Sequence, residues 1–226
     1  MRFYKFMPAA IWNFFHRLTF SILPIMLAII EPKDFIEEKI NKALFLDIDG
    51  VIQPFTEYRF EHVNRDGEME QLFKELENEF KVNYREFNRY DVAAAYYDWD
   101  RDAVKEVKRI FDTTGAKIVV SSSWRIGTTG DYFPFLLRIH DLQKYLYGYT
   151  PVFFKGLPEY DGIKHTRSVE ILEYLKKHPH IEKWVAVDDI DLSEDFPENA
   201  VVTYPKITTG DADRCIEILG REESES

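Results

Sequence analysis

Residues 42–54 read KALFLDIDGVIQP. Four apolar or small residues, ALFL, run directly into DIDG at residues 47–50. The apolar run predicts a short strand that is buried on both faces, as in a parallel sheet. Because Asp and Gly are poor strand residues, we expect the strand to end there and to present two carboxylates to a ligand.

A helix followed by a strand with a polar end recurs twice further along the chain. Residues 100–121 predict a helix that begins at Asp100 and stops at Gly115, followed by a strand over 117–120 that ends at Ser121. Residues 165–189 predict a second helix and a strand over 184–187 that ends in Asp188 and Asp189. A further strand is expected at 200–204, with a closing helix after it. This alternation indicates an α/β fold with a doubly wound, mostly parallel, Rossmann-like sheet and helices on both faces.

Two stretches interrupt the alternation, and we expect them to be small inserted cap elements. The first, at about residues 53–98, contains a charged helical pattern with one apolar face. The second, at about residues 126–160, is rich in aromatic residues, with a short helix expected around 135–145. The expected organisation is therefore one domain over residues 31–220 that carries both insertions, followed by a disordered tail at 221–226.

Aromatic side chains of the two insertions have two possible roles. They could cover a crevice and stack on a substrate ring, although such residues more often form the core of a small cap. They include Phe55, Tyr58, Tyr84, Tyr90, Tyr96, Tyr97, Tyr132, Phe133, Tyr147 and Tyr149.

The first thirty residues differ from the rest of the chain because they contain no acidic residue. Their apolar run, from Leu18 to Ile30, is interrupted by Pro24 and is shorter than the roughly 20 residues that a spanning helix needs. No small-residue cleavage site of a signal peptide follows it. Three interpretations stay open: an interfacial or packed amphipathic helix, a membrane anchor or uncleaved signal, and a translation start at Met26. We expect a cytoplasmic protein, with membrane association through residues 1–30 as the alternative.

Net charge and cysteine content exclude several classes. The formal charge of −11 argues against an extended, non-specific grip on polyanions such as duplex nucleic acid, but not against a local basic pocket. Cys215 is the only cysteine, which excludes an intrachain disulfide and a cysteine-rich zinc site.

The polar strand ends carry the predicted chemistry, because ligands of such sheets bind beyond the carboxyl ends of the strands. If the three strands are neighbours, four carboxylates and a hydroxyl meet in one crevice. Oxygen ligands without His or Cys favour Mg²⁺. A carboxylate can then act as the nucleophile toward a phosphate, and a second one can transfer protons. Gly50 would let the chain bend so that Asp47 and Asp49 face the same ligand.

These segments resemble a known superfamily. LFLDIDGV resembles the first motif of the haloacid dehalogenase (HAD) superfamily of phosphohydrolases, VVSSSW resembles its second motif, and VAVDD resembles its fourth. SSSWR, RSVEI and DD more narrowly resemble the phosphatase-like domain of Swiss Army Knife RNA repair proteins.

The resemblance implies a role for each matched residue. Asp47 would be the nucleophile and Asp49 the general acid/base. Asp47, the backbone carbonyl of Asp49 and Asp188 would hold Mg²⁺, with Asp189 at or just behind the metal. Ser121 would donate a hydrogen bond to the transferring phosphoryl group.

Other candidate residues are less sharply defined. The third motif is a single basic residue, for which Arg167 and Lys164 are the candidates, and the resemblance favours Arg167. Ser122 and Arg125 are candidates for substrate contact, although Ser122 could instead end a strand and begin a helix.

The predicted function is that of a Mg²⁺-dependent phosphomonoesterase with an aspartyl-phosphate intermediate on Asp47. Its substrate would be a phosphorylated small molecule or a nucleotide end, without extended nucleic-acid binding. One alternative is a phosphatase that processes nucleic-acid ends in RNA or DNA repair. An alternative of another class is a non-catalytic phosphate-binding or membrane-attached scaffold. The sequence does not indicate an oligomeric state.

Overall fold

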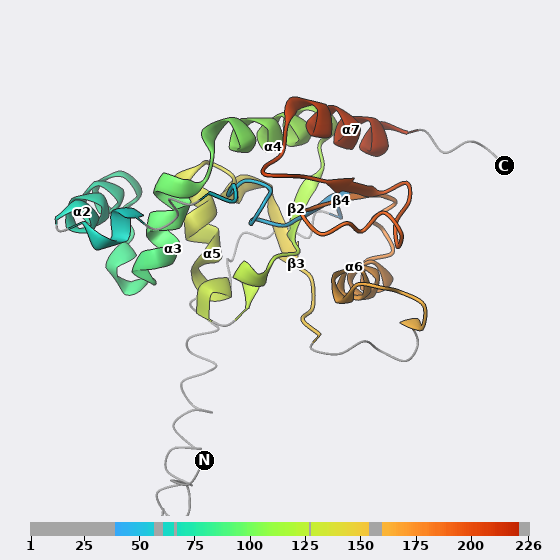
Figure 1. Ribbon diagram of the computed structural model, residues 1–226, viewed down its shortest axis with the longest axis horizontal. Helices are drawn as coiled ribbons and strands as arrows, with labels where there is room; N and C mark the ends of the chain where they lie inside the picture. Colours follow the sequence, from blue (N-terminus) through green and yellow to red (C-terminus); the bar gives the residue numbers. More distant parts are fainter. Residues whose placement is uncertain (1–38, 57–60, 66, 127, 154–159, 222–226) are drawn as a thin grey trace, which may run out of the picture. The chain divides into compact units, whose positions relative to one another are not determined.

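The computed structural model describes residues 39–56, 61–65, 67–126, 128–153 and 160–221. A five-stranded, all-parallel sheet with the strand order β3-β2-β1-β4-β5 forms its centre (Figure 1). The predictions for residues 1–30 and for the tail beyond Arg221 lie outside the described residues. The strands are β1 (Lys42–Leu46), β2 (Lys117–Val120), β3 (Leu146–Tyr149), β4 (Lys183–Asp188) and β5 (Ala200–Val202).

Strand β1 lies at the middle of the sheet and is buried on both faces, as its apolar sequence predicts. Its side chains alternate, so that Leu44 and Leu46 belong to one hydrophobic cluster and Ala43 and Phe45 belong to another. Leu46 is paired with residues of both neighbouring strands, β2 and β4. The residues that directly follow β1, β2 and β4 therefore meet at one edge of the sheet.

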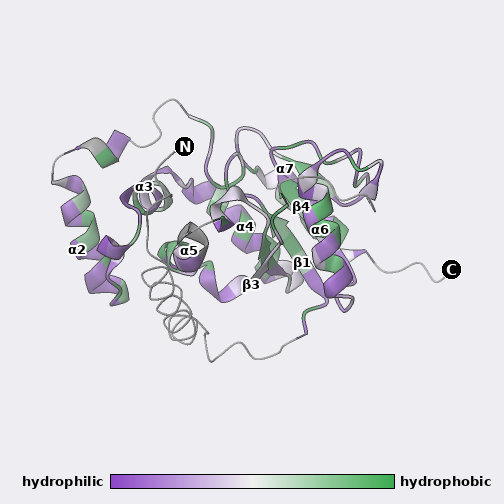
Figure 2. Cartoon of the chain, turned by 90° about the horizontal axis from the view of Figure 1, so that it is seen from below, coloured by the Kyte–Doolittle hydropathy of each residue, from purple (hydrophilic) through white to green (hydrophobic). Residues whose placement is uncertain are grey.

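Helices cover both faces of the sheet, which confirms the predicted fold class. Helices α4 (Arg101–Thr114) and α7 (Thr209–Gly220) lie side by side over one face, and α6 (Thr166–Lys177) packs against the other (Figure 1). Figure 2 shows hydrophobic strands between helices that carry both hydrophobic and hydrophilic residues. The predicted ends of α4 are confirmed, because the Asp100 carboxylate accepts hydrogen bonds from its first turn and Gly115 ends it in a left-handed conformation.

The first insertion is helical and packs on the second. It contains α2 (Glu68–Phe80), α3 (Arg89–Ala93) and a π-helix (Ala94–Asp98), and the apolar face of α2 is buried as predicted. The Tyr84 hydroxyl of this insertion donates a hydrogen bond of 2.9 Å to the carbonyl of Phe135 in the second. Short 3-10 helices lie at Glu61–Asn64, Tyr84–Glu86, Ser123–Arg125 and Gln143–Tyr145.

The second insertion differs from the prediction. Its helix, α5, spans Thr128–Ile139 rather than 135–145 and contains Pro134, which as a helix breaker obscured the pattern. Strand β3 was not predicted at all. It is a short strand at the edge of the sheet. It contains Gly148, where a Cβ atom would lie 2.5 Å from the Tyr174 hydroxyl of α6. The second insertion thus adds a strand to the sheet as well as a cap element.

The remaining predicted elements are close to those observed. Strand β5 ends at Val202, two residues before the predicted Tyr204, and the chain then turns back toward the loop that follows β1. Helix α7 begins with a capping box formed by Thr208 and Asp211. Among the described helices, we find none that has both the length and the apolar character needed to cross a membrane.

Candidate active site

Asp47 directly follows β1 and continues the pairing of the sheet. Its backbone N–H donates to the carbonyl of Val187 at 3.0 Å, which brings it level with Asp188 at the end of β4. Both side chains are buried, with 4% and 3% of their residue surface exposed. Two carboxylates from strands far apart in the sequence therefore lie side by side at the carboxyl edge of the sheet, where ligands of such folds bind.

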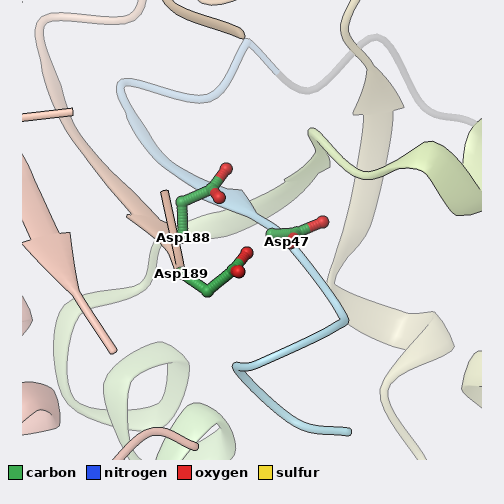
Figure 3. A group of neighbouring side chains, drawn as sticks. All are labelled: Asp47, Asp188 and Asp189. Atoms are coloured by element: carbon green, nitrogen blue, oxygen red, sulfur yellow. The ribbon is translucent and has the colours of Figure 1, made fainter. Parts of the chain in front are cut away.

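Asp189 completes a cluster of three carboxylates (Figure 3). One oxygen atom from each of Asp47, Asp188 and Asp189 lies within 4.8 Å of the others. Burial raises the pKa of Asp47 and of Asp188, and the negative charge of Asp47 raises the pKa of Asp188 further. Without a further positive charge, the ionised form of these two carboxyl groups is therefore disfavoured.

The donor set of this cluster fits a hard divalent cation. All three side chains offer oxygen atoms, which Mg²⁺ and similar ions prefer over nitrogen or sulfur. A bound cation would also stabilise the ionised form of Asp47 and Asp188, which burial disfavours. Asp47, Asp188 and Asp189 are thus residues that could hold a metal ion.

Arg167 is the basic residue that the fold places against this cluster. It lies in the first turn of α6, with its Nη1 atom 3.5 Å from Oδ1 of Asp47 and its Nε atom 3.6 Å from Oδ2 of Asp188. Its positive charge lowers the pKa of both carboxyl groups, against the larger effect of burial. Nη1 is buried and has no hydrogen-bond partner, so a donor is available for an anionic oxygen at this point.

Lys164, the other candidate for the basic residue, lies elsewhere. Its side chain is more than half exposed and pairs with Glu194. Its backbone N–H donates to the Asp195 carboxylate, so that the residue belongs to the turn that precedes α6. Within the described residues, the structure brings Arg167 to Asp47 and directs the Lys164 ammonium group to the surface.

Asp49 is placed near the cluster but is not part of it. Its Oδ2 atom accepts a hydrogen bond of 3.0 Å from the indole Nε1 of Trp124. Trp124 packs in turn against Trp99, with ring centroids 5.7 Å apart, and against Phe133. The side chain of Asp49 is therefore held by Trp124, which belongs to an aromatic group at the end of the first insertion and within the second.

Gly50 makes the turn that directly follows Asp49. Its φ of 71° is in the left-handed region, which glycine adopts without a steric penalty. A Cβ atom at this position would also lie 2.6 Å from the Cβ of Asp189 and 2.7 Å from Cε2 of Phe55. Any larger residue would thus push against the carboxylate cluster, which explains the glycine in the DIDG segment.

The first two of the three serines that follow β2 have different partners. The Ser122 hydroxyl is hydrogen bonded to the Asp47 carboxylate, which works to lower the pKa of that group. The Ser121 hydroxyl instead accepts a hydrogen bond of 3.4 Å from Thr150. Both serines are buried beside Asp47, and their contacts with a phosphate stay predictions.

Arg125 is directed toward the protein interior. Its guanidinium donates to the Glu170 carboxylate at 2.6 Å and to the carbonyls of Thr150, Pro151 and Ser122. Arg125 therefore has several hydrogen-bond partners within the protein. Its contact with a substrate stays a prediction.

Two residues that support the site were not found from the sequence. The buried carboxylate of Asp195 accepts hydrogen bonds from the backbone of His165 and the hydroxyl of Ser168, at the start of α6. Glu170 accepts from Arg125 and lies 4.0 Å from Nε of Arg167. The buried Glu170 could have been suspected from its position on the apolar face of α6, but no local pattern marks Asp195.

The fold and the site together define a class of protein. A parallel sheet whose central strand ends in two aspartates separated by one residue, with a basic residue and a further acidic pair on adjoining elements, is the arrangement of a HAD-type hydrolase. The chain belongs to the family described as the HAD domain in Swiss Army Knife RNA repair proteins, whose model matches residues 43–211. No curated protein and no solved structure matched the chain in the corresponding searches.

Proposed function

We propose that this chain is a Mg²⁺-dependent phosphomonoesterase that forms an aspartyl-phosphate intermediate on Asp47. The observation that carries the proposal is the position of Arg167, whose buried Nη1 has no hydrogen-bond partner and lies 3.5 Å from the Asp47 carboxylate at the edge of the acidic cluster. A phosphate bound there would bring anionic oxygens to Arg167 and its phosphorus atom to Asp47.

The proposed reaction has two steps. In the first, a carboxylate oxygen of Asp47 forms a bond to phosphorus, and the ester P–O bond breaks as the leaving oxygen takes a proton from Asp49. In the second, Asp49 accepts a proton from water as the water attacks phosphorus, which releases inorganic phosphate and restores the Asp47 carboxylate.

The other residues of the site bind and orient the reacting groups. Arg167 stabilises negative charge on the phosphoryl oxygens, and the Ser122 hydroxyl holds the Asp47 carboxylate. Mg²⁺ bound by Asp47, Asp188 and Asp189 would neutralise charge on the phosphate as it is transferred.

The test is phosphatase activity with Asp47→Asn, which removes the nucleophile and keeps its size. Hydrolysis of an aryl phosphate should fall by roughly three orders of magnitude or more, and EDTA should abolish the wild-type rate until Mg²⁺ is restored. Asp213→Asn is the matched control, because Asp213 is an exposed aspartate of α7 that pairs with Arg109. Full activity of Asp47→Asn would overturn the mechanism.

A second candidate function is the removal of phosphate from nucleic-acid ends. Membership of a family named for RNA repair proteins favours it, whereas the net charge of −11 disfavours extended contact with a polynucleotide. Rates with a 3′-phosphorylated oligonucleotide, mononucleotides and sugar phosphates would distinguish the two. A scaffold without catalytic activity is the alternative of another class, and Mg²⁺-dependent turnover would eliminate it.

A further inference from the structure

An exposed aromatic pair lies beside the acidic cluster. The rings of Phe55 and Tyr204 are stacked, with centroids 6.3 Å apart and an angle of 29° between their planes. Phe55 is 40% exposed and Tyr204 is 78% exposed, which is the largest exposure among the large hydrophobic residues of the described chain. An arrangement of two nearly parallel, solvent-exposed rings is suited to stacking with a third ring.

The pair is fixed to the loops that form the active site. A Cβ atom at Gly50 would lie between Asp189 and Phe55, so the Phe55 ring flanks the carboxylate cluster. Thr203, which precedes Tyr204, is buried and donates its hydroxyl to the carbonyl of Gly50 at 2.8 Å and its backbone N–H to the carbonyl of Asp188 at 3.0 Å. Tyr204 is therefore attached to both loops that supply the acidic residues.

Most other described aromatic residues of the insertions have a structural role. Tyr84, Tyr132 and Phe133 are buried in the hydrophobic core. Tyr96, Tyr97 and Tyr149 are partly buried and pack against that core. Phe55 is thus one of the few aromatic residues of the insertions that are left on the surface, and it is the one that lies at the site.

We propose that Phe55 and Tyr204 form a stacking platform for the nucleobase of a nucleotide whose phosphate occupies the Asp47 site. The inference rests on the proposed phosphatase function and specifies its substrate class. A nucleobase is separated from its phosphate by one ribose, so a ring can reach the platform while the phosphate stays at Arg167. Stacking requires no positive charge, which suits a protein with a net charge of −11.

The experiment compares a nucleoside 5′-monophosphate with ribose 5-phosphate, which share the sugar and the phosphate and differ by the base. Wild-type kcat/KM should be higher for the nucleotide by about tenfold, as expected for one base stacked on aromatic side chains. Tyr204→Ala should remove most of this preference, whereas Tyr204→Phe, which keeps a ring, should retain it. Tyr90→Ala is the matched control, because Tyr90 is a 47% exposed aromatic residue on α3.

The outcomes separate this inference from the proposed function. Equal kcat/KM for the two substrates in the wild type, or a preference that persists in Tyr204→Ala, would overturn the platform and leave the phosphatase proposal intact. If these two substrates and an aryl phosphate are all left unhydrolysed with Mg²⁺ present, the phosphatase proposal fails. Calorimetric binding of the nucleotide and ribose 5-phosphate to wild type and Tyr204→Ala still decides the platform. Tighter binding of the nucleotide that depends on Tyr204 would support it, and equal binding would overturn it.

Discussion

The indole Nε1 of Trp124 donates a 3.0 Å hydrogen bond to Oδ2 of Asp49. Trp124 follows β2, and its ring packs against Trp99, which directly follows the first insertion, and against Phe133 of the second. The orientation of the proposed general acid/base therefore depends on how the two insertions pack together, which links the cap elements to the chemistry of the site.

Trp124→Phe tests this link, because it keeps an aromatic ring and removes the N–H donor. We expect kcat to fall about tenfold, which is less than the roughly 100- to 10,000-fold that a positioned acid/base contributes, with little change in KM. Trp184→Phe is the control, since Trp184 packs against Phe45 on the other face of the sheet. A parallel rise in KM, or a loss of thermal stability that accounts for the lower rate, would show a structural role only.

Arg167 and Lys164 can be separated by substitution. Arg167→Ala should lower kcat/KM by roughly two to three orders of magnitude, because it removes a charged donor from the transferring phosphoryl group. Arg167→Lys should recover part of this loss, since it restores the charge without the planar fork of donors. Lys164→Ala should change kcat/KM less than twofold, as expected for an exposed side chain paired with Glu194. The reverse order of the two alanine variants would contradict the assignment.

The acidic cluster should make the effect of Mg²⁺ on stability dependent on pH. Burial raises the pKa of Asp47 and of Asp188 above the ordinary carboxyl value of about 4, so the folded protein binds more protons than the unfolded chain between that value and neutral pH. Without metal, these groups therefore reduce the free energy of unfolding as the pH rises through this window. Because Mg²⁺ replaces the protons, it should raise Tm more at pH 8 than at pH 6.

Thermal melts with EDTA or MgCl₂ at the two pH values measure this effect. Asp188→Asn removes one of the coupled carboxylates, and the Mg²⁺-dependent shift in Tm should become small at both pH values. An equal shift at pH 6 and pH 8 in the wild type would show that the cluster does not exchange protons for metal.

Asp195 should act as a positioning residue for Arg167. Burial works to raise its pKa, but hydrogen bonds from the backbone of Lys164 and the hydroxyl of Ser168 outweigh burial and lower it. Its contribution to stability is thus present above the ordinary carboxyl pKa and lost as the pH falls through the lower, folded value. Asp195→Ala should cost about 1–3 kcal/mol, the penalty for unpaired buried donors.

The effect on activity distinguishes positioning from stability alone. At a temperature where Asp195→Ala is fully folded, KM should rise more than kcat falls, because the start of α6 no longer holds the Arg167 guanidinium in place. Asp191→Ala is the control, since Asp191 lies in the same loop, is exposed and accepts a hydrogen bond from the backbone of Ser193. An unchanged KM in folded Asp195→Ala would contradict the assignment.

The sequence by itself determined the local elements and the acidic residues. Buried runs of apolar residues predicted β1, β2 and β4, and the Asp100 and Gly115 caps predicted the ends of α4. These signals are readable because burial on both faces and capping depend on residues close together in the chain. The same reasoning placed Asp47, Asp188 and Asp189 at strand ends, and they meet because β1 and β4 are neighbours in the sheet.

Tertiary structure decided the features that depend on contacts between distant segments. The way α6 is rotated about its axis directs Arg167 toward Asp47, whereas Lys164 lies before the helix and pairs with Glu194. The packing around the insertions brings Trp124 to Asp49. In β3, a Cβ atom at Gly148 would lie 2.5 Å from the Tyr174 hydroxyl of α6, and no pattern within LYGY reveals this contact. Likewise, the pairing of Phe55 with Tyr204 follows from hydrogen bonds that tie the loop after β5 to the turn after β1. Such contacts are set by the shapes of packed surfaces, and a linear pattern of residue types does not encode them locally.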